Sequence, residues 1–236
     1  MKLAPYMPAI RKALAEIAWI FIGITLALMF QNWNSARERQ RQELNLLTGL
    51  YRDLDETRFD LGRDIAANEK GLENARLMIR AFDDPAITGE QFSKAFAGGI
   101  LNGQLFPRTS AYDSIKTIGM DLISNDTLRK QIADVHELSL ARVDVAQESV
   151  QFYYRLYEDY RRTMFRLPAP VTISETRNSQ AVDTGIEQVD MQTITPNDYG
   201  SIRSNGTMKI MLAQSFNLAG ETIAIYSALD KEIVEA

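Results

Sequence analysis

The residue types that most often carry out enzyme chemistry are scarce in this chain of 236 residues. It contains no cysteine and a single histidine, His136. Thiol nucleophiles, cysteine-ligated metals and multi-histidine metal sites are therefore excluded. The nearby carboxylates Asp134 and Glu137 are two residues and one residue away, so neither shares the helical face of His136. We expect a histidine that faces solvent or packs in a helix seam.

Two groups of carboxylates could in principle bind a cation, but neither has the necessary spacing. Asp53, Asp55 and Glu56 lie together in one helical stretch, and we interpret them as part of a solvated face. Asp83 and Asp84 lie where a helix stops, and a calcium loop would need further oxygen ligands at fixed positions. Glycine-rich phosphate loops and nucleophile elbows are absent from the sequence. We therefore expect no enzyme, no metal site and no cofactor.

Glu16 is the remaining candidate for chemistry, because it lies in an otherwise apolar segment. Residues 13–30 read ALAEIAWIFIGITLALMF, in which Glu16 is the single charge. A carboxylate inside a bilayer is costly. Lys12, four residues earlier on the same helical face, could pair with Glu16 at the depth of the lipid headgroups. A proton or ligand site is the alternative interpretation.

The segment around Glu16 predicts a helix that crosses a membrane. Its eighteen residues would span about 27 Å, close to the hydrocarbon thickness of a bilayer. Trp33, among amide side chains, follows at interfacial depth. Trp19 and Gly23 complete the residues expected to contact membrane or a neighbouring helix, although Gly23 offers only a weak contact surface. We expect a transmembrane helix over 13–33 rather than a buried soluble helix or a cleaved signal peptide.

The orientation of this helix is indicated only weakly by charge. Lys and Arg are almost equally frequent on its two flanks. The first sixteen residues carry three positive charges and one negative, whereas the whole chain has a net charge of −5. We therefore expect the N-terminus, residues 1–12, in the cytoplasm. The main body would lie in the periplasm, anchored to the inner membrane.

Beyond the predicted span, apolar side chains recur at alternating spacings of three and four residues. The positions of this seam are Leu44, Leu47, Tyr51, Leu54, Arg58, Leu61, Ile65, Asn68, Leu72, Ala75 and Ile79. The period predicts an amphipathic helix of about 45 residues that ends at Ala81. Its two polar members, Arg58 and Asn68, would select the register of a coiled coil. The seam could pair with a helix of the same chain or with a second copy.

Capping and breaking residues predict the remaining elements. Thr88 would cap a helix over 89–97, Ser110 would start a second short helix, and Asn125 would cap a long helix that continues to about Phe165. We expect 34–166 to form a long helical hairpin with short capping helices. An irregular connection or short strands would occupy 167–204, and a final helix 205–236. The predicted fold is all-α, with the transmembrane helix continuing into an antiparallel helical bundle.

The end of the third long helix, residues 151–168, is rich in aromatic and basic side chains. If this helix returns antiparallel to the first, its similar length would bring its end back to the bilayer. Aromatic and cationic side chains favour lipid headgroups. The candidate membrane contacts are Tyr157, Tyr160, Arg161, Arg162 and Phe165. An ordinary aromatic seam between helices is the alternative, and the sequence does not separate the two.

Two stretches resemble a family of uncharacterised bacterial single-pass membrane proteins. The first is EIAWIFIGITLALMFQNWN, which matches the family pattern through Glu16, Ile17, Gly23, Gln31, Asn32, Trp33 and Asn34. The second is FPRTSAYDSIKTIGMDLISNDTLRKQI, which matches through Ser110, Tyr112, Ile115, Gly119 and Ile123. The resemblance implies a single-pass topology with a helical body. It implies no catalytic residues, because the family has no established activity.

Two classes of function remain after these exclusions. In the first, the protein is a structural or assembly subunit that docks on a larger membrane complex, photosynthetic or respiratory, or self-associates. In the second, it is an extracytoplasmic sensor-like or ligand-binding helical module. Only about twelve residues precede the span, too few for a signalling domain, so we favour the first class. The expected partners are the lipid bilayer and other membrane subunits or a second copy. Nucleic acid is not expected, because the net charge is negative.

Overall fold

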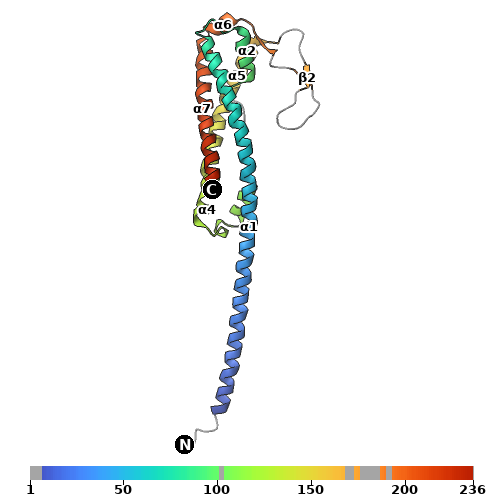
Figure 1. Cartoon of the computed structure of the whole chain (residues 1–236), viewed down its shortest axis with the longest axis vertical. Helices are drawn as coiled ribbons and strands as arrows, with labels where there is room; N and C mark the ends of the chain where they lie inside the picture. The colour runs from blue at the N-terminus through green and yellow to red at the C-terminus, as the bar shows by residue number, and fades with distance from the viewer. Residues whose placement is uncertain (1–6, 101–103, 168–172, 176–186, 190–192, 236) are drawn as a thin grey trace.

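The computed structural model describes residues 7–100, 104–167, 173–175, 187–189 and 193–235. Within them one long helix, α1, runs almost the whole length of the molecule (Figure 1). The other elements gather beside its C-terminal half, and its N-terminal half stands alone. The fold is all-α, as the sequence predicts, with two small two-stranded sheets added.

Helix α1, Met7–Ala81, contains 75 residues and is roughly 110 Å long at 1.5 Å per residue. It passes residues 12 and 33, where the sequence suggests domain boundaries, without a break. Proline is absent between Pro8 and Pro85, so nothing in this interval forces a kink. The predicted end at Ala81 is confirmed. One part of α1 is long and apolar enough to cross a membrane, and the body buries none of it.

Two short helices follow, both at predicted positions. Thr88 caps the first through a reciprocal pair of bonds: its hydroxyl accepts from the Gln91 backbone N–H, and its own N–H donates to the Gln91 side chain at 2.9 Å. Gly119 ends the second with a φ of 126°, a conformation that other residues rarely adopt. The elements are α2 Gly89–Gly98, α3 Ser110–Ile118 and a 3₁₀ turn, η1 Met120–Leu122.

The predicted third long helix is present, but it is interrupted by a π-helical turn. Asn125 caps its start, because its side-chain oxygen accepts from the backbone N–H groups of Thr127 and Leu128 at 3.0 and 3.1 Å. The apolar period of the sequence does not reveal the π turn. The successive elements are α4 Asp126–Asp134, η2 Val135–Ser139 and α5 Leu140–Met164.

The region expected as an irregular connection contains short strands and one short helix. The elements are β1 Phe165–Arg166 paired with β4 Thr195–Pro196, β2 Ile173–Glu175 paired with β3 Glu187–Val189, both antiparallel, and α6 Tyr199–Ser204. Asp198 caps α6 by accepting from the Gly200 N–H at 2.9 Å. The rest of the expected connection, 168–172, 176–186 and 190–192, lies outside the described residues.

The last helix, α7, Gly206–Glu235, packs against both α1 and α5. Its start clusters with Met78 near the end of α1, whereas its end clusters with Leu50, so α7 is antiparallel to α1. Ile132 of α4 clusters with Leu50 and Tyr157 of α5 clusters with Met78, so α5 runs parallel to α1. The expected hairpin of α1 with the third helix is therefore wrong. Between α2 and α4 the chain passes back to the end of the body nearest the apolar part of α1, so α5 starts there and runs parallel to α1. The antiparallel partner of α1 is therefore α7.

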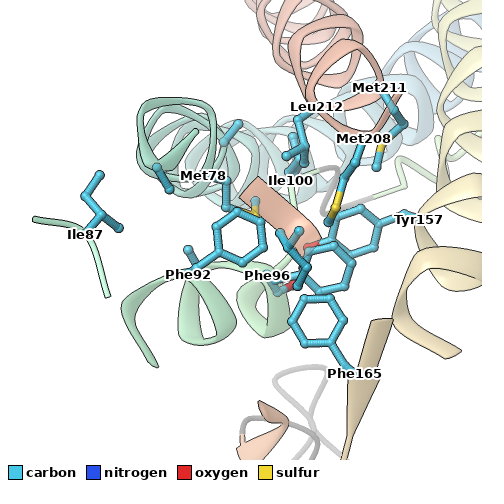
Figure 2. Close-up of a cluster of buried hydrophobic side chains, with 14 of the residues drawn as sticks. Met78, Ile87, Phe92, Phe96, Ile100, Tyr157, Phe165, Met208, Met211 and Leu212 are labelled. Atoms are coloured by element: carbon cyan, nitrogen blue, oxygen red, sulfur yellow. The ribbon is translucent and has the colours of Figure 1, made fainter. Parts of the chain in front are cut away.

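Two clusters of buried side chains hold the body together. The cluster farther from the apolar part of α1 is aromatic and methionine-rich, and Figure 2 shows its members converging from α1, α2, α5 and α7. Phe92 and Phe96 of α2 lie at its centre, and both are fully buried. The other cluster joins Leu50, Leu54 and Leu61 of α1 to residues of α3, α4, η2, α5 and α7.

Candidate interaction surface

The apolar part of α1 presents its side chains without contact to the body. Glu16, Trp19 and Trp33 are exposed, and a side chain added at Gly23 would meet open space. The ring centroids of Trp33 and Phe30 are 5.9 Å apart, and the Arg37 guanidinium lies 5.1 Å from the centroid of the Trp33 ring. The Arg37 contact places a cation on an indole, and both groups favour a membrane–water interface. These residues therefore form a surface suited to lipid or another helix.

The aromatic end of α5 lies at the end of the body away from the apolar part of α1, so the antiparallel return on which its expected membrane contact rested is wrong. Tyr157 stacks on Phe96 with ring centroids 4.0 Å apart, and Phe165 stacks on the same ring at 4.3 Å. Arg161 pairs with Glu158 at 2.9 Å. Tyr160 is half-buried, and Arg162 is exposed at this distal end. The alternative interpretation, an aromatic seam between helices, describes Tyr157 and Phe165.

The seam predicted along α1 largely coincides with the surface that packs into the body. Leu54, Leu61 and Asn68 are buried, and the side chain of Leu61 is completely enclosed. The partly buried members are Leu47, Ile65 and Leu72. The seam changes character toward the apolar segment, where Leu44 is 60% exposed and Tyr51 is 73% exposed.

The two polar seam residues are satisfied in different ways. Arg58 donates from Nε to Asp230 of α7 at 2.9 Å and so fixes the register of these two helices. Asn68 is buried, and its amide donates to the Asp64 carbonyl of its own helix at 2.9 Å. Of these two seam residues, Arg58 bonds to another helix, whereas the Asn68 bond described here stays within α1. Leu50 is also buried, although the predicted seam runs through the neighbouring Tyr51, which is exposed; Leu50 lies three residues after Leu47 and four before Leu54 and so fits the same spacing.

The acidic group on α1 holds the segment before α3 in place, so its interpretation as a solvated face is incomplete. Asp53 accepts from the Ser110 hydroxyl and the Ala111 N–H, both at 2.8 Å, and so caps α3 from a different helix. Arg108 reaches Glu56 at 2.5 Å and Asp60 at 2.8 Å. This docking could not be predicted from α1 alone, because the partners are about fifty residues away.

His136 lies in the π-helical turn and is packed against α3. Its ring is parallel to that of Tyr112, with centroids 4.1 Å apart, and neither ring nitrogen has a hydrogen-bond partner. Burial lowers the pKa of His136, while Asp113 and Asp53 oppose that shift. Tyr112 donates to Glu137 at 2.9 Å, and burial together with this bond raises the pKa of Tyr112 to about 12. His136 is a seam histidine, one of the two expected environments.

Two apolar grooves lie on the surface of the body. The first, here called the α1–α4–α7 groove, has a volume of about 360 Å³ and is lined by Leu47, Leu50, Tyr51, Leu54, Asp55, Arg58, Leu128, Ile132, Ile233 and Val234. The second, about 510 Å³, lies between α5 and α7 and includes the exposed Leu138 and Val145. Within the described part of the chain, no three His, Asp or Glu side chains group as metal ligands. Both grooves suit apolar contact.

Comparison with known proteins adds no assignment to this geometry. No protein-family model, curated protein or solved structure matches the chain. The resemblance to a family of single-pass membrane proteins stays a prediction. A function must therefore be argued from the arrangement of the chain itself.

Proposed function

We propose that the protein is a membrane-anchored scaffold whose helical body docks on a larger assembly of membrane proteins. The observation that carries this proposal is the continuity of α1. The same helix supplies an apolar stretch that the body leaves uncovered and the seam around which the body folds. No proline lies between Pro8 and Pro85, so none forces a sharp kink between the apolar stretch and the seam. The body would therefore be held at a fixed distance and rotation relative to the bilayer.

The surface of the body supports contact as the main activity. Its grooves are lined mainly by aliphatic side chains, which favour burial against another apolar surface. The charged residues at the junction of α1 and α3 are engaged with one another, as Arg108 is with Glu56 and Asp60. Their role in the fold is to position α3.

The native mass of the extracted protein tests the proposal. The tagged chain, extracted from its membrane in mild detergent, should migrate well above twice its own 26.7 kDa. Raising the detergent or salt concentration should release the protein from the assembly, because noncovalent contacts between separately folded subunits hold it there. Migration as a monomer or dimer under the mildest conditions would contradict docking on a larger assembly.

The proposed location is the inner membrane, with the N-terminus in the cytoplasm and the body in the periplasm. It is supported by the greater share of negative charge beyond the apolar segment. A phosphatase fused after Ala236 should be active, and a fluorescent protein that matures only in the cytoplasm should stay dark there. The reverse pattern would place the body in the cytoplasm while leaving the anchoring role intact.

A further inference from the structure

The interface between α1 and α7 continues along α1 beyond the part that α7 covers. Leu54 and Leu61 are buried where α7 packs on the seam. One and three seam positions closer to the apolar segment than Leu54, Tyr51 and Leu44 are 73% and 60% exposed. Leu47, between them, is partly buried. An apolar helix surface with coiled-coil spacing is thus open over about two turns.

The α1–α4–α7 groove lies at this same place. Leu47, Tyr51 and Leu54 form its α1 wall, while Ile132 and Ile233 belong to the walls supplied by α4 and α7. Helix α4 and the end of α7, which supply two walls of the groove, lie at the end of the body nearest the apolar part of α1 (Figure 1). Leu47 is fourteen residues beyond Trp33, which corresponds to roughly 21 Å along α1. A helix leaving the bilayer beside α1 would reach the groove within four turns.

The charged residues of α1 differ between the part beside the groove and the part between the groove and the apolar segment. At the level of the groove, Arg58 is already neutralised by Asp230 at 2.9 Å. Between the apolar segment and the groove, Arg37 is exposed one heptad before Leu44, on the same side of α1 as the seam, whereas Arg39 and Arg41 lie about 200° apart around the helix. A complementary helix would therefore carry a carboxylate opposite Arg37 near the membrane and be apolar farther out.

We propose that the α1–α4–α7 groove, with Leu44 and Tyr51, binds one amphipathic helix of a different integral membrane protein that leaves the same bilayer beside α1. This inference rests on the proposed scaffold function and names the docking site and partner class for it. The apolar face of the bound helix covers the seam from Leu44 to Leu54, and a carboxylate of the bound helix faces Arg37. The recognition mode is that of an apolar helix face lying in a groove.

A second copy of this chain does not fit the groove as well as a different helix does. Two copies in one membrane would place their α1 helices side by side and parallel. The second α1 is continuous to Ala81. If it followed the open seam of the first, it would meet the end of α7 at Ile233 and Val234, which close the groove. The occupant must be a helix that ends or turns at this level.

Photo-crosslinking in native membranes tests the proposal with matched positions on α1. A benzophenone amino acid would replace Tyr51 in the full chain, and Phe59 in a second version as the control. Both are exposed aromatic residues of the same helix, at 73% and 70%, and only Tyr51 lines the groove. Tyr51 should give an adduct at least about tenfold more abundant than Phe59 does, the ratio expected for a contact at the centre of an interface.

Mass spectrometry of the adduct decides the identity of the occupant. Tyr51 is eighteen residues, or roughly 27 Å, beyond Trp33 on α1, so the proposal requires a crosslinked peptide within about twenty residues of a transmembrane segment of another protein. A crosslink to a second copy, to lipid or to a protein outside the membrane would overturn it. Equal adducts from both positions, or none from Tyr51, would also overturn it.

A pair of surface variants tests the proposal without the crosslinker. Leu44→Asp combined with Tyr51→Asp should reduce co-purification of the partner that the crosslinking identifies by about tenfold or more, whereas Phe59→Asp should leave it unchanged. All three positions are exposed, so the fold should survive. If Tyr51 gives no adduct but the extracted protein still migrates in a large assembly, the groove inference fails alone. Migration as a free monomer would remove the scaffold function as well.

Discussion

At the scale of single residues, His136 combines close packing with an absence of hydrogen bonds. Its side chain is 9% exposed and stacks on Tyr112, with both ring nitrogens unpartnered. Burial favours the neutral imidazole and lowers its pKa below the ordinary 6.5, against the opposing effect of Asp113 and Asp53. Lys116 and Glu137 form an ion pair nearby at 3.0 Å. The folded protein therefore binds a proton at His136 less readily than the unfolded chain does.

This difference predicts how stability changes with pH. A base with a lowered pKa in the folded state contributes its full stability above its unfolded pKa, and that contribution is lost as the pH falls below about 6.5. His136→Phe keeps the stacked ring and removes the titration. Thermal unfolding in detergent between pH 7.5 and 5 should show a wild-type melting temperature that declines relative to that of His136→Phe. Parallel curves for the two proteins would contradict the prediction.

Asp53 provides a second test at this scale, because it caps α3 from outside that helix. Asp53→Ala removes the acceptor of both the Ser110 hydroxyl and the Ala111 N–H. A lost cap costs about 1 kcal/mol, or roughly 2–4 °C in the melting temperature of a protein of this size. Asp55→Ala is the control, since it removes the same charge two residues away on α1. Equal melting temperatures for the two variants would show that the cap contributes nothing.

At the scale of elements, α1 carries two faces with opposite tolerance to charge. Leu61 is fully enclosed by the body, whereas Phe59 is 70% exposed. Leu61→Asp would bury an unpaired carboxylate and should cost more than about 3 kcal/mol. Phe59→Asp should cost less than about 0.5 kcal/mol, since it is a surface change. Denaturant unfolding of both variants measures this contrast, and a similar loss in both would argue against the seam.

The helices differ in how well their positions and directions can be predicted from the sequence. The three-four spacing from Leu44 to Ile79 predicts the C-terminal half of α1. Thr88 and Asn125 predict the starts of the helices that they cap. Both kinds of signal involve residues close together in the sequence. The direction of α5 is not local. It depends on how far the chain travels between Gly99 and Asn125. The stacking of Tyr157 on Phe96 and the capping of α3 by Asp53 follow from that path. The assumed antiparallel return therefore put the aromatic end of α5 at the wrong end of the body, whereas the alternative of an aromatic seam did not depend on direction.

The residues of the α1–α4–α7 groove likewise include some that the sequence predicts and some that it does not. Leu54 and Leu61 are seam residues by spacing alone, since burial of a helix face leaves a period in the sequence. Leu50 and Ile233 line the groove only because α4 and α7 meet α1 at that level. Residue spacing within one helix carries no information about such a meeting. The helix α6 was missed for another reason, because its six residues are too few to show a period.

At the scale of the whole molecule, the apolar part of α1 determines whether the body is anchored at all. Gly23→Arg should prevent stable integration, because an arginine at the centre of a span costs about 2.5–3.5 kcal/mol on insertion scales. Gly62→Arg is a matched control on the same helix, and both glycines have open space around them. Resistance to carbonate extraction measures integration. Retention of Gly23→Arg at the wild-type level would rule out this segment as the anchor.

If α1 is anchored as proposed, its unbroken course makes it a lever with its pivot in the bilayer. From Phe30 to Ala81 the lever arm is roughly 76 Å at 1.5 Å per residue. A change in tilt of about 10°, well within the range that transmembrane helices adopt as bilayer thickness varies, would sweep the distal end sideways by roughly 13 Å. The α1–α4–α7 groove, closer to the pivot, would move only about a third to a half as far. Thickening or thinning of the bilayer would thus be amplified toward the distal, aromatic end of the body.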